Sequence, residues 1–237
     1  MPLEIHNAPH HTVWRVGYEP EPLSWSGWEH AHDGRFPGRW DDPDGRFRTL
    51  YLGATLKGCL LEVLAHARKD MYLTKDLEDI EEEPEDAQDH PTINPGEMDR
   101  DWLRTRCAAE ATLSGHYCAV TAGETIAELH GRFIGPALDA GHDDFDASLL
   151  KNASPEGRKI TRAVSAYLYL RDDIDGVEFA SRHGDEERMW CVYEQPHEQS
   201  RMSRHLMDLG PRNLTEDTPE LIEAFRLLGL RWRDPVN

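Results

Sequence analysis

Alternating and branched apolar residues predict strands in the first part of the chain. The segments TVWRVG (12–17) and RTLYLG (48–53) combine aromatic and β-branched residues between turn-forming neighbours, a pattern typical of strands. Between them, up to about residue 46, Gly, Pro, Trp and Asp dominate, which indicates a long structured loop.

The segment TLKGCLLEVLAHAR (55–68) carries the clearest helical pattern in the first half. Thr55 is a suitable N-cap, and Glu62 lies far round the helix from the apolar stripe. Either Glu62 is a solvated helix residue, or this side of the helix borders a cleft into which Glu62 points. Periodicity alone favours the solvated position. The stripe consists of Leu56, Leu60, Val63, Leu64 and Ala67.

The second half mixes further helices and strands. Residues 156–171 have a broad apolar face after a helix start at Ser154-Pro155, and Thr218, Pro219 and Gly229 frame a last helix. A short helix is expected in TIAELHGRF, and a helix or a helix-to-strand segment in DRDWLRTRCAAEATL. Strands are expected in HYCAVTAG, in VEFAS after a turn marked by Gly176, and in MWCVYE. This irregular order excludes a doubly wound array and predicts a mixed α/β or α+β protein.

Length and charge narrow the function classes. The chain has 237 residues, which suggests one large domain or one domain with additions. Its 45 acidic and 26 basic residues give a net charge of −19, which argues against nonspecific binding to DNA or to a membrane surface. A few well-placed arginines can still hold a phosphate. The acidic run at 76–90 is expected to be a solvated loop or a disordered insertion.

No sequence motif requires a metal or a known nucleotide loop. The four cysteines form no CxxC pair, and none of the 13 histidines stands in an HExxH motif. Walker, GxGxxG and GxSxG motifs are also lacking. No apolar run approaches the length of about 20 residues that spans a bilayer, and no secretory signal is visible at the start. We therefore expect a cytoplasmic protein without a metal.

Five segments in order resemble the RES domain family, which is named for an arginine, a glutamate and a serine. The family pattern has an early arginine-containing strand, an arginine in a Gly-Arg-Trp context, a Tyr-Leu strand, a helix with a glutamate, and an Asp-Gly segment that ends in the serine. The matching segments are WRVG (14–17), GRW (38–40), LYLG (50–53), LLEVLAH (60–66) and DGVEFASRHG (175–184), and WCVYE resembles the strand that follows.

The resemblance implies an α+β fold similar to ADP-ribosyltransferases, with a mixed sheet core and flanking helices. It also implies an enzyme that consumes NAD. It assigns catalytic roles to Glu62, Tyr51 and Arg39. A carboxylate stabilises the positive charge that develops on the ribose, and an aromatic ring stacks on the nicotinamide. Arg39 and Arg15 hold phosphate, and Ser181 hydrogen-bonds the ligand.

Alternatives to these roles stay open. Arg35 or Arg46 could hold the phosphate in place of Arg39, and Arg182 is a weaker candidate. Each of the candidate side chains could also serve the fold alone, in the core, in an ion pair or at a turn. Asp41 follows the Trp where the family usually has Asn, which puts in doubt which arginine does what.

The resemblance also implies partners and a domain layout. Residues 1–200 would form the catalytic domain, with an acidic insertion near 76–100, and residues 201–237 a C-terminal helical extension. Family members are typically toxins that pair with a helix-turn-helix antitoxin protein, and a homodimer is expected. The reaction would be cleavage of the nicotinamide–ribose bond of NAD. Transfer of ADP-ribose to a protein, or an interaction role without chemistry, are the alternatives.

Overall fold

A large mixed sheet forms the centre of the molecule. The computed structural model describes residues 2–68, 96–196 and 198–234. Eight strands lie in the order β1-β6-β7-β8-β3-β2-β5-β9, in which β6 and β7 run parallel and the other neighbours antiparallel. The strands are β1 (Ile5–Asn7), β2 (Val13–Tyr18), β3 (Thr49–Gly53), β5 (Arg106–Leu113), β6 (His116–Ala119), β7 (Gly176–Ser181), β8 (Gly184–Tyr193) and β9 (Leu206–Asn213), and β4 (Glu97–Met98) pairs separately with β10 (Arg231–Trp232).

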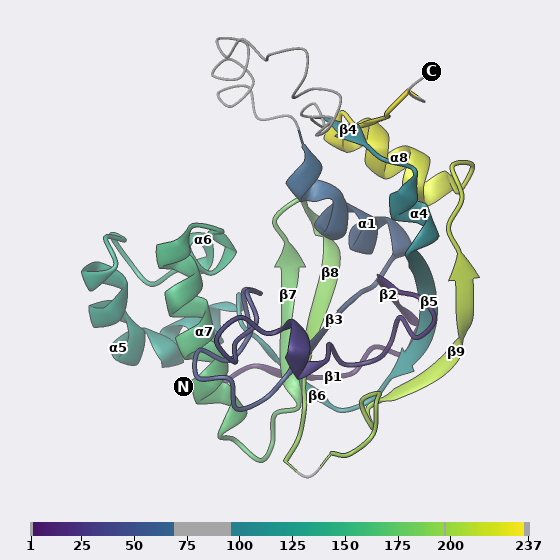
Figure 1. Ribbon diagram of the computed structural model, residues 1–237. Coiled ribbons are helices and arrows are strands. Elements are labelled where there is room, and N and C mark those ends of the chain that lie inside the picture. The colour runs from purple at the N-terminus through teal and green to yellow at the C-terminus, as the bar shows by residue number, and fades with distance from the viewer. Residues whose placement is uncertain (1, 69–95, 197, 235–237) are drawn as a thin grey trace, which may run out of the picture.

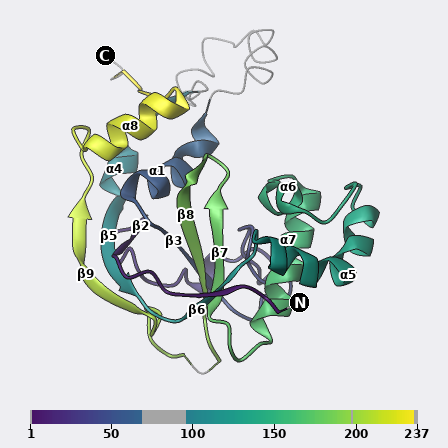
Figure 2. The same cartoon turned by 180° about the vertical axis from the view of Figure 1, so that it is seen from behind.

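Helices form two separate groups, as Figures 1 and 2 show from opposite sides. One group lies beside β6 and β7, and the other lies across the ends of the strands from β8 to β9. The first group is α5 (Gly123–Asp139), α6 (Ala147–Lys151) and α7 (Pro155–Tyr169); the second is α1 (Leu56–Leu64), followed by the 3-10 turn η2 (Ala65–Ala67), with α4 (Asp101–Arg104) and α8 (Pro219–Leu228). A further 3-10 turn, η1 (Trp28–His30), interrupts the long loop before β3. The predicted α+β class with a mixed sheet and flanking helices is confirmed.

Local sequence accounts for most helix ends. Thr55 and Ser154 accept the backbone N–H groups of Gly58 and Gly157 and so cap α1 and α7. Gly229 closes α8 in the left-handed region, with φ of 68°. Thr218 is the N-cap residue of α8, as predicted, but its hydroxyl makes no capping bond to the helix and instead accepts the N–H of Thr215.

The core divides into three apolar clusters that the helices and loops cover. The first joins α5, α6 and α7 to β6, β7 and β8. The second joins α1 and α8 to β2 and β5. The third contains Leu50 and Leu52 of β3 with Trp190 and Val192 of β8. Since the other side of β3 and β8 packs against the first cluster, these two strands are buried on both faces.

Several elements differ from the sequence prediction. β9 lies in the segment predicted as a helical extension, and it pairs along its length with β5. Its sequence LMDLGPRN contains Gly and Pro and is largely exposed, so it lacks the usual strand signal. Gly176 begins β7 instead of marking a turn, and α5 is longer than the short helix expected. The acidic run at 76–90 lies outside the described residues, and the domain boundary at 200 stays a prediction.

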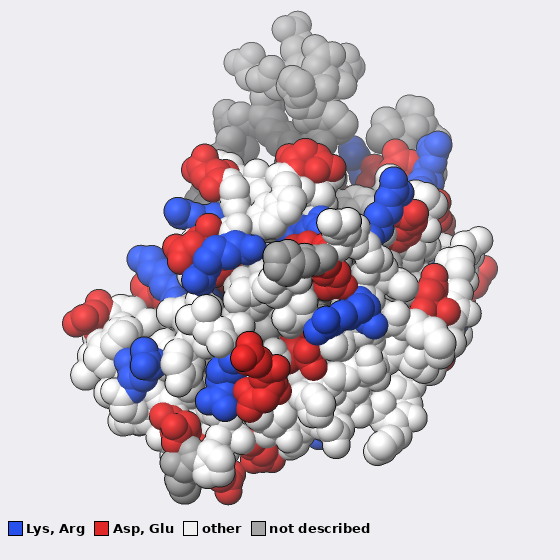
Figure 3. Space-filling view, turned by 90° about the horizontal axis from the view of Figure 1, so that it is seen from below, with Lys and Arg blue, Asp and Glu red and all other residues white. Residues whose placement is uncertain are grey.

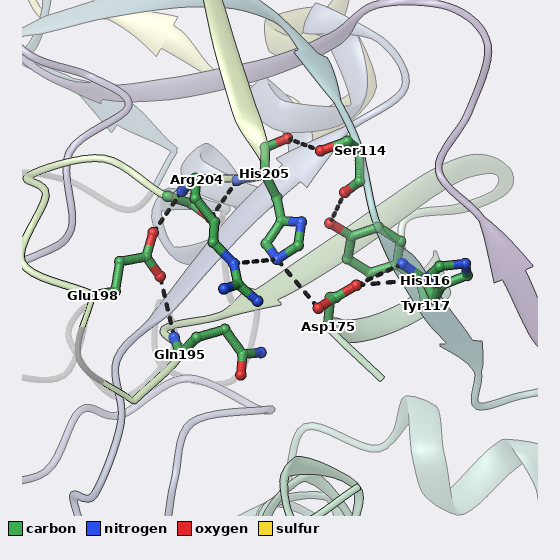
Figure 4. A network of polar contacts seen from close by, with 9 residues as sticks. Ser114, His116, Tyr117, Asp175, Gln195, Glu198, Arg204 and His205 are labelled. Atoms are coloured by element: carbon green, nitrogen blue, oxygen red, sulfur yellow. Dashed lines mark hydrogen bonds and ion pairs between the residues drawn. The ribbon is translucent and has the colours of Figure 1, made fainter. Parts of the chain in front are cut away.

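The start of β7 is anchored by a paired polar network (Figure 4). Asp175 accepts the backbone N–H of His116 at 2.9 Å and lies 3.2 Å from His205 Nε2. Tyr117 Oη donates to the carbonyl of Ser114, and the Ser114 N–H donates to the carbonyl of His205. Gly115 permits this approach, because its φ is +105° and an added Cβ would lie 2.7 Å from Asp175 Oδ2.

Charged side chains of both signs are interspersed on the face seen from below in Figure 3. Lys and Arg lie beside Asp and Glu there, without a broad area of one sign. No helix among the described residues is long and apolar enough to cross a membrane. Since the charges on this face are mixed, a group of several side chains with the same charge in another part of the molecule needs an explanation.

Candidate active site

A cavity of about 460 Å³ opens at the seam between the two helix groups. Val16, Cys59 and Val63 reach it from the second apolar cluster, and Phe179 and Met189 from the first. The polar lining is four arginines, one glutamate and one tyrosine, which come from β2, the loop before β3, β3 itself, α1, α7 and the turn after β7. These residues are Arg15, Arg39, Tyr51, Glu62, Arg158 and Arg182.

Glu62 enters this cavity from α1 with one oxygen held and the other unbonded. Ser181 Oγ donates to Glu62 Oε1 at 2.6 Å, and the backbone N–H of His183 donates to Ser181 Oγ at 3.0 Å. Because the Ser181 oxygen accepts the His183 N–H, the hydroxyl proton points toward Glu62. No donor among the described residues hydrogen-bonds Glu62 Oε2. Periodicity left two positions open for Glu62, in solvent or facing a cleft, and the structure places it in the second.

The loop that carries Arg39 is clamped by α7. Three consecutive carbonyls, those of residues 38 to 40, each accept a bond from an α7 side chain. The donors are Arg162 Nε at 2.9 Å, Thr161 Oγ1 at 2.7 Å and Ser165 Oγ at 2.6 Å. Since Thr161 and Ser165 are fully buried, the clamp fixes this loop against a rigid helix.

Tyr51 presents its ring to the cavity while its hydroxyl is used inside the protein. The hydroxyl accepts the Trp40 N–H at 2.9 Å and donates to Asp41 Oδ1 at 3.1 Å. Asp41, only 4% exposed, also accepts the Gly38 N–H and the Thr49 hydroxyl. Burial, and then the Asp41 charge, raise the pKa of Tyr51 well above its usual range. The hydroxyl therefore stays protonated and ties β3 to the Arg39 loop.

The four cavity arginines have no carboxylate partner among the described residues, and no ion pair joins any of them to the rest of this part of the chain. Arg15 Nε is buried without a hydrogen-bond partner, and burial lowers the pKa of Arg15 to about 10. Burial also lowers the pKa of Arg39, although the Glu62 charge opposes this shift. Arg158 and Arg182 are exposed, whereas Arg15 and Arg39 are partly buried. Because burying an unpaired cation is costly, Arg15 and Arg39 indicate a site for an anion.

The structure separates the predicted site residues into two sets. Arg15, Arg39, Tyr51 and Glu62 line one cavity, and fully buried Ser181 holds Glu62 from the end of β7. The Ser181 hydroxyl is thus engaged within the protein, whereas the resemblance implied a direct bond to ligand.

Two other candidates lie elsewhere. Arg35 is exposed in the loop before β3 and is not part of the cavity lining. Arg46 makes a bidentate pair with buried Asp42 and so serves the structure of the loop. The interpretation that Arg46 holds a phosphate therefore has no support from the geometry.

Sequence reasoning missed Arg158 and gave Arg182 too little weight. Arg158 lies in the first turns of α7, among other charged residues, where an arginine is typical of an ordinary surface position. The only signal for Arg182 and His183 was their position directly after the serine of the family pattern. One sequence does not show which charged side chains lie opposite these arginines in the folded protein.

The comparisons with known proteins bear on this site. The family model of the RES domain matches residues 12–211. The chain belongs to the RES domain family. The match spans the cavity residues of this RES domain and extends into β9.

The other comparisons add one structural relative. A search of curated protein sequences found no significant match. Among solved structures, a chain from the crystal structure of the M. tuberculosis MbcT-MbcA toxin-antitoxin complex is similar, with a TM-score of 0.45 and 16% identity. The similarity covers 94% of this chain and 91% of that chain.

Proposed function

We propose that this RES domain cleaves the nicotinamide–ribose bond of NAD at the cavity between α1 and α7. One observation carries the proposal: four arginines that have no carboxylate partner among the described residues share a single cavity with one glutamate. A cavity of about 460 Å³ falls within the range of about 300–1,000 Å³ that is common for small-molecule sites. NAD combines a diphosphate, which needs cations, with a ribose that becomes positive during cleavage.

The arginines are suited to the diphosphate of such a substrate. Guanidinium groups bind phosphate oxygens through charge-assisted and often bidentate bonds. Arg39 is held on a clamped loop, while Arg158 belongs to the helix that clamps it. Because the site arginines are not paired within the described protein, they need not break an ion pair before they bind an anion. We assign the diphosphate to this group, with Arg15 buried deepest among them.

Glu62 is suited to the reacting end. As nicotinamide leaves with the bonding electron pair, C1′ of the ribose gains positive charge, and a nearby carboxylate lowers the energy of that state. Ser181 fixes Glu62 Oε1, so Oε2 is available to the ribose. The Tyr51 ring forms a flat wall on which the nicotinamide can stack. An acceptor then attacks C1′ and completes the reaction.

We also propose the biological setting that the family implies, in which the chain is a toxin held inactive by a helix-turn-helix antitoxin. Loss of NAD would stop growth, and the antitoxin would prevent it. Expression of the chain alone should arrest growth, and the Glu62→Ala variant should not. Growth arrest by both proteins would separate toxicity from this cavity.

The direct experiment is NAD consumption by purified protein, with and without phosphate, read by HPLC. We expect loss of NAD with the wild type and none with Glu62→Ala. Free ADP-ribose as product would identify water as the acceptor, and a phosphorylated product would identify phosphate. No loss of NAD under either condition would contradict the proposal.

A further inference from the structure

His183 lies in the turn between β7 and β8, beside both Glu62 and Arg182. Its Nε2 is 4.0 Å from Glu62 Oε2 and accepts a hydrogen bond of 3.1 Å from Arg182 Nε. The His183 side chain is only 12% exposed. It therefore contacts the catalytic carboxylate on one side and a cavity arginine on the other, without lining the cavity itself.

The contacts define the protonation state of His183. The Arg182 guanidinium can only donate, so the bond that it makes requires a lone pair on His183 Nε2. His183 is then neutral, with its proton on Nδ1. The 4.0 Å separation from Glu62 is too long for a hydrogen bond, which leaves Glu62 Oε2 unbonded among the described residues.

The surrounding charges favour this neutral state. Burial is the largest influence and lowers the pKa of His183. Glu62 on α1 acts in the opposite direction, whereas Arg182 in the same turn, Arg68 after η2 and Arg39 in the clamped loop add to the lowering. The net result is a pKa below the ordinary value of about 6.5.

We propose that His183 is a positioning residue whose proton controls Glu62. In the neutral state it holds Arg182 and leaves Glu62 Oε2 open to the substrate. When it gains a proton it loses the bond from Arg182 and becomes a cation next to Glu62, only a small movement away from an ion pair. The carboxylate is then neutralised by the protein and no longer stabilises the ribose cation.

The inference rests on the proposed function and predicts a specific pH dependence. Activity should be high above the pKa of His183 and should fall as the pH drops through it. On a logarithmic plot of kcat/KM this acid limb should have a slope of one and a midpoint below about 6.5. A merely structural role for His183 would not produce a limb that follows this one residue.

The kinetic test compares three variants with the wild type. In His183→Gln, the amide oxygen can accept from Arg182 but cannot be protonated, so the acid limb below about pH 6.5 should disappear. Activity at pH 7.5 should stay within about threefold, since the Arg182 bond is kept. His183→Lys places a cation there permanently, and should lower activity at pH 7.5 at least about tenfold. His205→Gln is the matched control, because His205 also follows an arginine and lies beside a carboxylate, and the limb of this variant should equal that of the wild type.

An NMR titration of the histidine ring separates failure of this inference from failure of the proposed function. The His183 signal, assigned by its loss in His183→Gln, should titrate below about 6.5. It should move lower still in Glu62→Gln, which removes the opposing charge, and higher in Arg182→Ala. A His183 that is protonated at pH 7, or an acid limb that persists in His183→Gln, would overturn the inference. An inactive wild type would overturn the proposed function alone, and the titration would still decide the role of His183.

Discussion

The two ends of strand β7 carry similar residues in opposite arrangements. At each end the Nε of an arginine lies close to Nε2 of the histidine that follows it, at 3.1 Å for Arg182 and His183 and at 3.2 Å for Arg204 and His205. At the start of the strand, His205 lies 3.2 Å from Asp175, and Glu198 accepts the Arg204 N–H (Figure 4). At the other end, His183 stays 4.0 Å from Glu62.

The difference lies in how the charges are balanced. Asp175 uses both oxygens on groups of the protein, and its network joins the loop before β9 to β6 and β7. Glu62 keeps one oxygen unbonded beside four arginines that have no carboxylate partner in the described ranges. A paired network stabilises a fold, whereas an unbalanced one leaves charge for a ligand. The same residue types therefore serve structure at one end of β7 and, in the function we propose, binding at the other.

Substitution of Glu62 should have the largest effect. Glu62→Gln keeps the bond from Ser181 but removes the charge, so kcat for NAD cleavage should fall about 10²–10³-fold. The melting temperature should change little, because within the described ranges the Glu62 carboxylate has only this one hydrogen bond. Glu223→Gln, which alters a carboxylate paired with Arg226 on α8, is the control and should retain full activity. A Glu62→Gln enzyme within threefold of the wild type would remove Glu62 from the mechanism.

Loss of a cavity arginine should weaken binding more than catalysis. A bond to a charged phosphate contributes about 1.5–3 kcal/mol, so Arg158→Ala should raise KM about 10–100-fold. Steady-state kinetics would measure this change, with kcat less affected. Arg171→Ala, which removes an arginine already paired with Asp173, should leave KM unchanged. An unchanged KM in Arg158→Ala would contradict the assignment of the diphosphate.

Substitution of Arg15 should increase the stability of the protein, because this buried arginine lowers the free energy of unfolding. Its Nε is buried without a partner, and such a group costs about 1–3 kcal/mol. Arg15→Met should therefore raise the free energy of unfolding while it weakens NAD binding. Urea denaturation and isothermal titration calorimetry measure the two effects. A less stable Arg15→Met protein would show that the arginine has a structural role.

Asp175 should behave in the opposite way, with a modest effect on stability alone. Burial would raise the pKa of Asp175, but hydrogen bonds from His205 and the His116 N–H, with the nearby positive charges, hold it below its usual value. A lowered carboxyl pKa stabilises the fold above the pKa of the unfolded chain, and this contribution is lost as the pH falls through the folded value.

Asp175→Asn should therefore lower the free energy of unfolding at pH 7 by about 1–2 kcal/mol without changing kcat/KM. The difference from the wild type should shrink as the pH is lowered to about 3. Denaturant curves at several pH values measure it. A difference that is the same at every pH would show that the Asp175 charge is not involved.

Local patterns sufficed to predict much of the fold. β3 and α1 have strong periodicity and turn or cap residues at their boundaries, so their residues could be placed from sequence. β9 could not, because its pairing with β5 depends on a partner almost 100 residues away and its own composition is weak. The register of an edge strand is decided by the sheet that it joins.

The candidate site was predictable only in part. The spacing of Arg39, Tyr51 and Glu62 matched a family pattern, and the structure gathers all three at one cavity. Arg158 could not be found this way, because α7 reaches the cavity through its clamp on the Arg39 loop. Nor could periodicity show that the Tyr51 hydroxyl is occupied by Asp41. Contacts between distant segments determine which polar groups remain available.

The central claim is that one end of β7 binds and cleaves NAD while the other end only stabilises the fold. The most direct test is NAD consumption at pH 7.5 by the wild type, Glu62→Gln and Asp175→Asn, read by HPLC. We predict that the wild type and Asp175→Asn consume NAD at similar rates and that Glu62→Gln does not. Equal consumption by Glu62→Gln, or none by the wild type, would contradict this account.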